Sequence, residues 1–417
     1  MKYQTENNLT KTTPKKFYYL WQYVEWGGAQ ILLLGLMKEA KKFGEVQAVI
    51  PRGSNEQLLK FLGNLNITTK FFDGQTDIKP AYTLKRKLQR HWNKLYFEFN
   101  LISYLSKLDF RNSVIHTEFA PWQSMLMLLW LCRKAQVFVT MHNSLPGNSI
   151  MRSAIWKIKF RILGRSKNFH LFTANKDTKN SLKPLVSQDF LNKVKVTYAS
   201  INPWEIKEAL RSELNRAEIL RKYNLPENKF LVFCVGQFID RKGRWIFLEA
   251  ARQLSKNNNE FAFVWISNSK PSYEDLEKAE SYNLGRNFVF ITSDQVGTEH
   301  IDLFNLLRQA DVFALASYLE GLPISILEAM ALGIPTVSTN INAIPEAVKH
   351  LETGLLIEPG DTCGLKDAIL LLKSDHSLRE KLSIEGKKYV LKNFDETVVA
   401  KIVVKHYINS LQNKDGQ

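Results

Sequence analysis

Short apolar runs alternate with helix-length segments along almost the whole chain, and this alternation limits the possible folds more than any other feature of the sequence. A strand followed by a helix and another strand gives a parallel sheet with helices on both faces. The first series of runs lies at 17–23, 46–50, 69–72, 113–118, 136–142, 170–175 and 193–198, and the second at 230–236, 261–267, 287–293, 311–317 and 335–339. The sequence therefore predicts an α/β fold with two tandem Rossmann-like domains built on parallel sheets.

The two series are separated near Asn202-Pro203. At roughly 150 residues per domain, a chain of 417 residues gives a prior of two to three domains. We therefore expect a first domain at residues 1–203 and a second at residues 204–393. The final segment, 394–417, has a helical pattern with no strand after it, so we expect it to brace the first domain.

The composition is that of a folded, water-soluble protein, with 45% apolar and 24% charged residues. Cys132, Cys234 and Cys363 lie far apart and form no C-x-x-C pair, which indicates buried thiols in a reducing compartment. No run approaches the ~18 apolar residues that a membrane span requires, and the polar N-terminus lacks the apolar centre of a secretory signal. The expected location is the cytoplasm.

The net charge of +16 is concentrated in the first half of the chain. Residues 1–200 carry 31 Lys and Arg against 12 Asp and Glu, a balance of +19, whereas residues 201–417 carry 26 against 29, a balance of −3. One basic half beside a near-neutral half favours docking of a single face on an anionic surface, either a membrane or a nucleic acid. No nucleic-acid-binding motif is present, so nucleic acid is not an expected partner.

Several common site motifs are absent from the sequence. It has no G-x-G-x-x-G dinucleotide fingerprint, no P-loop, no G-x-S-x-G, no zinc-type ligand cluster and no D-x-D. These absences disfavour a nicotinamide dehydrogenase and a P-loop NTPase, and they predict no metal and no cofactor. A bound nucleotide would have to be neutralised by side chains and helix amides.

Residues 317–348 carry the most informative motif. An apolar strand ends at Ser317, Pro323 is placed for the first turn of a helix, and Gly333 marks the end of that helix. A helix N-terminus at the carboxyl edge of a parallel sheet favours a phosphate. Glu320 and Glu328 would flank this phosphate, which they repel, so we interpret them as acceptors for sugar and ribose hydroxyls. The alternative is that both are solvated surface charges.

The sequence EGLPISILE at 320–328, followed by AMALGIPTVST and IPEAV, resembles the E-x7-E segment of retaining GT-B glycosyltransferases, specifically glycosyltransferase family 4. The similarity runs along nearly the whole chain and is strong over about 230–395. It implies a donor cleft between two Rossmann-like domains, with Glu320 on the donor sugar and Glu328 on the ribose. It also implies backbone N–H contacts to the donor, here from Gly321, Leu322, Ile324 and Ser325, because Pro323 has no N–H.

A second match to this family is VGQFIDRKGRWIFLEAA at 235–251. The resemblance implies that Lys242 binds the donor diphosphate. Gln237 stands where the family commonly has an arginine, and glutamine supplies neither the charge nor the fork of that side chain. Arg241 is the candidate replacement, with a solvated turn as the alternative reading of Arg241-Lys242.

In the first domain, Gly27 and Gly28 of WGGAQ follow a strand and open a helix, similar to the family's N-terminal glycine loop. His142 ends a strand and matches a family position beside the transferring sugar; a structural histidine is the alternative. Further candidate contacts at strand ends are His116, Glu118, Asn175 and Lys176.

Residues 82–99 and 150–167 mix Lys and Arg with aromatic residues. In the second segment one side of an ideal helix carries a candidate membrane contact. This stripe consists of Arg152, Trp156, Lys159, Phe160, Leu163 and Lys167. The alternative is a solvated helix whose aromatics pack on a neighbour. Family 4 enzymes often elongate lipid-linked acceptors, so the resemblance favours peripheral docking at the inner face of the cell membrane.

The sequence as a whole predicts a metal-independent, retaining glycosyltransferase. It would move a sugar from a UDP- or GDP-sugar to a hydroxyl of a glycan or lipid-linked saccharide, as in surface polysaccharide or lipopolysaccharide biosynthesis. Glu320, Lys242 and His142 are the predicted catalytic residues, and the nucleotide sugar is a co-substrate. Alternatives are a GT-B sugar-nucleotide epimerase and a non-catalytic carbohydrate- or lipid-binding protein.

Overall fold

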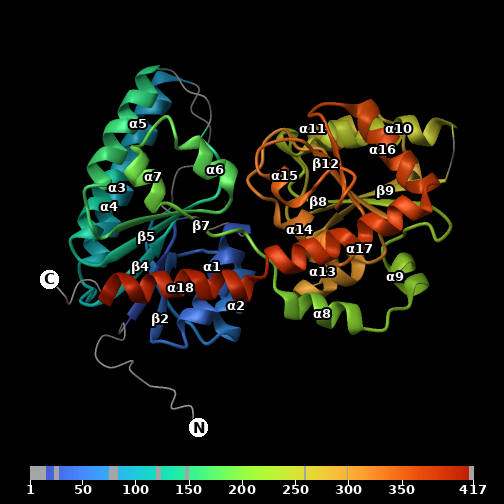
Figure 1. The fold of residues 1–417 in the computed structure, drawn as a ribbon. Coiled ribbons are helices and arrows are strands. Elements are labelled where there is room, and N and C mark those ends of the chain that lie inside the picture. Colours follow the sequence, from blue (N-terminus) through green and yellow to red (C-terminus); the bar gives the residue numbers. More distant parts are fainter. Residues whose placement is uncertain are drawn as a thin grey trace, which may run out of the picture. The chain divides into compact units, whose positions relative to one another are not determined.

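The computed structural model describes residues 16–22, 28–74, 83–118, 124–145, 150–257, 260–297 and 299–412. The chain divides into two compact units (Figure 1). The first unit takes in the chain up to Tyr198 and again from Thr397, and the second unit runs from Ala199 to Glu396. Each unit is built around one parallel sheet, as the alternation of strands and helices predicts.

The sheet of the first unit has seven strands in the order β3-β2-β1-β4-β5-β6-β7, and all neighbouring strands are parallel. These strands are β1 (Lys16–Leu20), β2 (Glu45–Pro51), β3 (Thr68–Phe72), β4 (Ser113–Thr117), β5 (Gln136–Met141), β6 (Phe169–Thr173) and β7 (Lys195–Val196). Chain order reverses between β1 and β4, so the crevice for a ligand is expected at the carboxyl ends of these two strands.

Helices cover both faces of this sheet. They are α1 (Gly28–Ala40), α2 (Glu56–Asn64), α3 (Leu84–Leu105), α4 (Met125–Cys132), α5 (Ile150–Leu163), α6 (Lys176–Ser181), α7 (Gln188–Lys193) and α18 (Glu396–Gln412). One core joins α3, α4 and α5 to one face of the sheet, and the other core joins α1, α2 and α18 to the opposite face.

The last helix, α18, completes the second of these cores. Val403, Val404 and Tyr407 are buried against strand residues such as Phe17 and Phe138. The final segment is therefore a helix that covers the sheet of the first unit. It follows the whole second unit in the chain.

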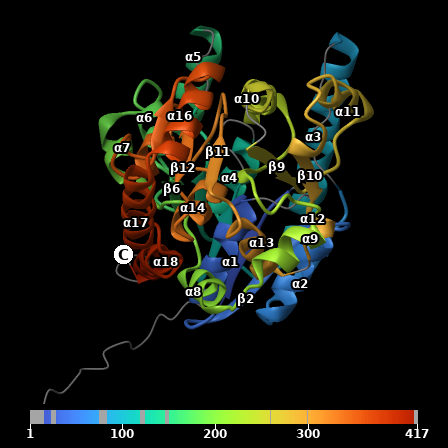
Figure 2. The same cartoon turned by 90° about the vertical axis from the view of Figure 1, so that its right-hand side faces the viewer.

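The second unit has a six-stranded sheet in the order β10-β9-β8-β11-β12-β13, again with parallel neighbours (Figure 2). The strands are β8 (Phe230–Val235), β9 (Phe261–Ser267), β10 (Phe288–Thr292), β11 (Val312–Leu315), β12 (Thr336–Thr339) and β13 (Leu355–Ile357). The sequence did not predict β13, because a run of three residues is too short to be distinguished from a loop. Chain order reverses between β8 and β11.

The helices of the second unit begin at Asn202, whose side chain caps α8 and precedes Pro203 at the first helical turn. They are α8 (Pro203–Arg211), α9 (Arg216–Lys222), α10 (Arg244–Asn257), α11 (Tyr273–Glu280), α12 (Ser293–Val296), α13 (His300–Leu307), α14 (Ile324–Ala331), α15 (Ile344–Ala347), α16 (Thr362–Ser374) and α17 (His376–Asn393), with 3-10 turns η1 (Asp240–Lys242) and η2 (Gly285–Asn287). The Asn202-Pro203 pair therefore starts a helix a few residues inside the second unit.

The cysteines differ in part from expectation. Cys132 and Cys234 are buried free thiols, as predicted, but Cys363 is exposed because it lies in the first turn of the amphipathic α16. Among the residues that the structure describes, no helix combines the length and the apolar character that crossing a bilayer requires.

Candidate active site

The loops after β8 and β11 meet at the point where strand order reverses in the second sheet. Ligands of open α/β sheets bind at the carboxyl ends of the strands at such a point. The loop after β8 carries Arg241 and Lys242, and the loop after β11 carries Ser317 and Glu320. Two motifs that are distant in the sequence are therefore brought together.

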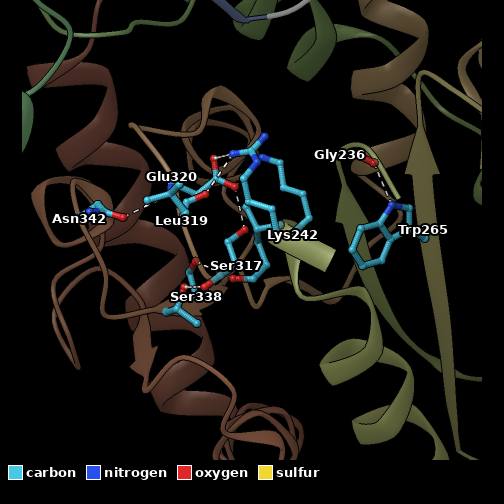
Figure 3. A network of polar contacts seen from close by, with 11 residues as sticks. Gly236, Lys242, Trp265, Ser317, Leu319, Glu320, Ser338 and Asn342 are labelled. Carbon is cyan, nitrogen blue, oxygen red and sulfur yellow. Dashed lines mark hydrogen bonds and ion pairs between the residues drawn. The ribbon is translucent and has the colours of Figure 1, made fainter. Parts of the chain in front are cut away.

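Glu320 is the centre of a polar cluster (Figure 3). It is only 5% exposed, so the alternative of a solvated surface charge is wrong. Its Oε1 lies 2.7 Å from Lys242 Nζ and accepts a hydrogen bond of 2.8 Å from Ser317 Oγ. Its Oε2 lies 3.4 Å from the Arg241 guanidinium. Two cations thus surround one buried carboxylate, leaving the cluster with a net positive charge.

The backbone around Glu320 is fixed at both ends. The N–H of Glu320 donates to Asn342 Oδ1 at 3.3 Å (Figure 3). The Arg241 side chain donates to the carbonyl of Leu319 at 3.0 Å, and the backbone carbonyl of Arg241 accepts from the N–H of Tyr318 at 2.8 Å. The two loops are therefore joined by main-chain as well as side-chain bonds, which orients the charged groups before any ligand binds.

The turn that presents Lys242 is held by buried contacts of its own. The Trp265 indole N–H donates to the carbonyl of Gly236 at 2.8 Å. Arg244, just after the turn, bridges Asp240 at 3.0 Å and Asp275 at 2.7 Å. Because Arg244 is engaged in this way, it fixes the turn, whereas Lys242 and Arg241 face Glu320. Gln237 is half-buried in the same turn, and Arg241 brings to Glu320 the second cation that this sequence lacks at position 237.

Helix α14 begins directly after this loop. Pro323 occupies the position just before the helix, and Gly333, with φ of 82°, ends it. The N–H groups of Ile324 and Ser325 belong to the first turn, where helix amides have no partner within the helix. Gly321 and Leu322 lie in the loop that leads into it. The four predicted N–H donors therefore stand in one stretch beside Glu320.

Glu328 lies further along α14, where it contacts a histidine that sequence reasoning missed. It is 4% exposed, and its Oε1 lies 3.0 Å from His300 Nε2. The other ring nitrogen of His300, Nδ1, lies 2.7 Å from Glu205 of α8. Burial disfavours the charged ring, but the two carboxylates outweigh it and raise the pKa of His300 to about 10. A half-buried imidazolium thus holds the buried Glu328 in place.

We expect His300→Gln to lower the free energy of unfolding by about 3 kcal/mol near pH 6.5, because it leaves the buried Glu328 and the half-buried Glu205 without their shared cation. A raised pKa stabilises the fold fully below the ordinary histidine pKa, and this contribution is lost as the pH rises toward about 10. Urea unfolding should therefore show that the free energies of unfolding of the wild type and of His300→Gln converge as the pH rises from 6.5 to 10. A difference independent of pH would contradict a charged His300.

In the first unit, the structure brings together His142 and Glu118, which follow β5 and β4. His142 Nε2 lies 3.3 Å from Glu118 Oε1, and both groups are largely shielded from solvent. Asn175 donates to the backbone carbonyl of His142 at 3.1 Å and also caps α6. Asn175 is fully buried and positions His142.

His116 is not at the edge of the sheet, contrary to the sequence prediction. It is fully buried, its Nδ1 contacts the Tyr407 hydroxyl, and its Nε2 lies 2.8 Å from Thr140 Oγ1. Burial lowers its pKa to about 3, so the ring is neutral. Gly28 is the first residue of α1, and Gly27 lies outside the described residues.

The prediction that the aromatic residues of α5 contact a membrane is wrong. Trp156 is 8% exposed and Phe160 1% exposed, because together with Leu163 they pack in the core against the sheet. Arg152 and Lys167 are exposed and Lys159 is half-buried. The opposite arc of α5, which includes Ile150 and Ile158, faces outward instead. The packed-helix alternative describes these aromatics correctly.

The second unit matches a known family model. Residues 215–389 match the model of the glycosyl transferases group 1, a range that includes Lys242, Glu320, Glu328 and His300. One relative is the alpha-D-kanosaminyltransferase of Streptomyces kanamyceticus, 29% identical over 41% of this chain and 43% of that protein. Another is the N,N'-diacetylbacillosaminyl-diphospho-undecaprenol alpha-1,3-N-acetylgalactosaminyltransferase of Campylobacter jejuni, 29% identical over 48% of this chain and 50% of that protein. The chain spans about half the length of these two relatives.

Solved structures match over nearly the whole chain. A glycosyltransferase from Rickettsia africae is similar with a TM-score of 0.74 and 17% identity, over 97% of this chain and 100% of that one. Anabaena HepE in complex with UDP-glucose is similar with a TM-score of 0.71 and 15% identity, over 95% and 99%. At these identities the likeness concerns the fold. The chain therefore has the GT-B fold of solved glycosyltransferases, and its second unit carries the segment typical of the glycosyl transferases group 1.

Proposed function

We propose that this protein is a retaining glycosyltransferase that moves a sugar from a UDP- or GDP-sugar to a hydroxyl of a glycan or lipid-linked saccharide. The observation that carries the proposal is the buried Glu320 held by Lys242 and Arg241 at the strand-order reversal of the second sheet. The match of this segment to the group 1 model supports it. So do the names of the relatives, which include a kanosaminyltransferase, a phosphatidylinositol monomannoside mannosyltransferase and a capsular polysaccharide biosynthesis glycosyltransferase.

The charges of the cluster suit a diphosphate next to a sugar. Two cations face one carboxylate, so one positive charge remains for an incoming diphosphate. When the phosphates approach Lys242 and Arg241, Glu320 is released in part from these partners and can accept a hydrogen bond from a sugar hydroxyl. Glu328, whose Oε1 is held by His300, can accept from the ribose. In this arrangement neither glutamate touches the phosphates.

For the chemical step we propose attack on the face from which the diphosphate departs. The bond between the anomeric carbon and the phosphate oxygen breaks, the bond to the acceptor oxygen forms, and the acceptor proton passes to the departing phosphate. The developing charge on the phosphate is met by Lys242, Arg241 and the first N–H groups of α14. His142, whose Nε2 lies 3.3 Å from Glu118 Oε1, stays a predicted catalytic residue of the first unit. No divalent metal is assigned to this step, and we propose that transfer persists in EDTA.

A thermal-shift screen over UDP-, GDP- and ADP-sugars tests the proposal. A donor at about 100 times its Kd stabilises the folded state by about 2.7 kcal/mol, which raises the Tm by several degrees. We expect a UDP- or GDP-sugar to produce this shift, and Lys242→Met to abolish it. If none of these nucleotide sugars binds, the proposal fails.

The alternatives are distinguished by following the donor that binds. A transferase releases nucleoside diphosphate in proportion to glycosylated acceptor. An epimerase converts the donor to an isomer with no acceptor present, and a binding protein leaves it unchanged over long incubation with a panel of glycan and lipid-linked acceptors. Either of the last two results would contradict transferase activity.

A further inference from the structure

Helix α3 is packed along only half of its length. Its C-terminal half is anchored by Phe97, Leu101 and Leu105, which belong to the core beside the sheet. From Thr83 to Tyr96, by contrast, every residue is exposed except Arg86 and Lys94, which are half-buried. About three turns of helix therefore stand clear of the body of the first unit; α3 can be followed to the upper end of the view in Figure 2.

This exposed part of α3 has an apolar stripe that no described residue covers. At about 100° per residue, the stripe falls within about 120° of the helix circumference. Its members are Leu84, Leu88, Trp92, Leu95, Tyr96 and Phe99, with exposed fractions from 38% to 74%. The buried residues Phe97 and Leu101 lie on the opposite side of the helix. A helix that exposes six large apolar side chains in one row is typical of an interaction surface.

Three basic residues, Lys85, Arg86 and Lys87, lie within or beside the stripe, and Arg90 and Lys94 lie toward the opposite side of the helix. Between Thr83 and Tyr96 the helix carries five Lys and Arg and no Asp or Glu. These cations are Lys85, Arg86, Lys87, Arg90 and Lys94. The first acid is the buried Glu98, which lies 3.7 Å from Lys94. Burial lowers the pKa of Lys94, Glu98 opposes this effect, and Lys159 of α5 adds to it, so further positive charge lies nearby.

We propose that the exposed face of α3 docks the protein on an anionic lipid bilayer, with the apolar stripe in the headgroup region and the neighbouring Lys85, Arg86 and Lys87 side chains on the lipid phosphates. Trp92 and Tyr96 are suited to the membrane–water interface, and Leu88 and Phe99 to the acyl boundary just below it. Each cation near such a surface contributes about 1 kcal/mol. An apolar protein partner would match only the stripe, whereas a bilayer with acidic headgroups matches both the stripe and the excess of positive charge in this part of the helix.

This docking rests on the proposed function, because it would hold the enzyme at the surface where lipid-linked acceptors lie. It differs from the α5 stripe expected from the sequence, whose aromatics are buried. The docking surface is defined by side chains outside the donor site, so membrane binding and donor binding can be measured separately.

Flotation with lipid vesicles tests the proposal on the full chain. We expect the protein to float with vesicles containing 30 mol% phosphatidylglycerol and to bind phosphatidylcholine vesicles about 10-fold less, with binding that weakens at high salt. Replacing Leu88 and Trp92 by serine should reduce binding to the anionic vesicles at least ~10-fold. The matched control is Ile155→Ser with Ile158→Ser on the exposed arc of α5, which should bind nearly as wild type.

Three results of the flotation experiment would overturn the docking surface. These are indifference of the wild type to anionic lipid, undiminished binding of the α3 variant, and an equal loss in the α5 control. The alternative occupant of this face is a second copy of the chain, which gel filtration of the wild type and of the α3 variant tests. A wild-type dimer that the α3 substitutions convert to a monomer would contradict a lipid occupant. The α3 variant should keep the Tm and the donor-induced thermal shift of the wild type. Absence of any donor shift in the wild type would therefore count against the proposed function and leave the vesicle result standing.

Discussion

Transfer should fall about 100- to 1,000-fold when Lys242 is replaced by methionine, the range typical of removing one group that stabilises transition-state charge. Lys242 Nζ lies 2.7 Å from Glu320 and is largely shielded from solvent, so its charge acts at low effective dielectric. Arg241 is more exposed and 3.4 Å from the same carboxylate, so we expect Arg241→Met to cost only about 10-fold. Initial rates of nucleoside diphosphate release, with the donor found in the screen, measure both effects.

Removing Lys242 alone leaves Glu320 buried without its nearest cation, which could lower stability as well as activity. The double variant Lys242→Met with Glu320→Gln removes both charges, so it should regain the wild-type Tm while staying inactive. Inactivity of the single variant together with recovery of activity in the double variant would mean that the pair is only structural. Wild-type turnover in Lys242→Met would remove Lys242 from the mechanism.

Substitution of Gly243 by alanine should cost about 4 kcal/mol of unfolding free energy or more, among the largest effects of a single substitution. Gly243 has φ of 71°, and a Cβ there would lie 1.8 Å from the backbone oxygen of Ala316. Relief requires the Lys242 turn to separate from the loop after β11, so the site would be lost together with the stability. Urea unfolding monitored by Trp fluorescence measures the change.

Gly285→Ala is the matched control. Gly285 also has a positive φ, 52°, but nothing lies within 4 Å of the Cβ that alanine would add. Only the conformational strain of about 1–2 kcal/mol should appear there. Equal losses at the two positions would show that close approach of the two loops contributes nothing to stability.

The sheets could be predicted from the sequence because their strands are buried on both faces. Runs such as 230–236 and 261–267 contain a single polar residue, Ser267, and lie within one residue of β8 and β9. The E-x7-E segment was also interpretable, because Gly333 and the proline before α14 fix the ends of one helix. In these cases the structure depends on residues that are close together in the chain.

The contacts of His300 could not be predicted in this way. Its partners, Glu205 and Glu328, lie on two other helices, and Glu205 is 95 residues away along the chain. A single histidine in a polar segment gives no periodic signal that points to either partner. The contact of both carboxylates with one histidine becomes visible only when α8, α13 and α14 are placed together.

Helix periodicity was similarly incomplete for α3 and α5. Spacing of three and four residues defines an arc on a helix, but it does not say whether that arc faces the sheet. On α5 the aromatic arc with Trp156 faces the core, whereas on α3 the arc with Trp92 faces outward. Assigning each arc requires the position of the strands beneath it.

The place of α18 has a consequence for biosynthesis. The helix covers Phe17 and Phe138 in the sheet of the first unit, yet it is encoded after the whole second unit. During translation, the part of this face that α1 and α2 do not cover therefore stays exposed until residues 396–412 have been synthesised. The half that emerges second is the first to be finished, so a chaperone would be needed most during the long interval in which the earlier half remains incomplete.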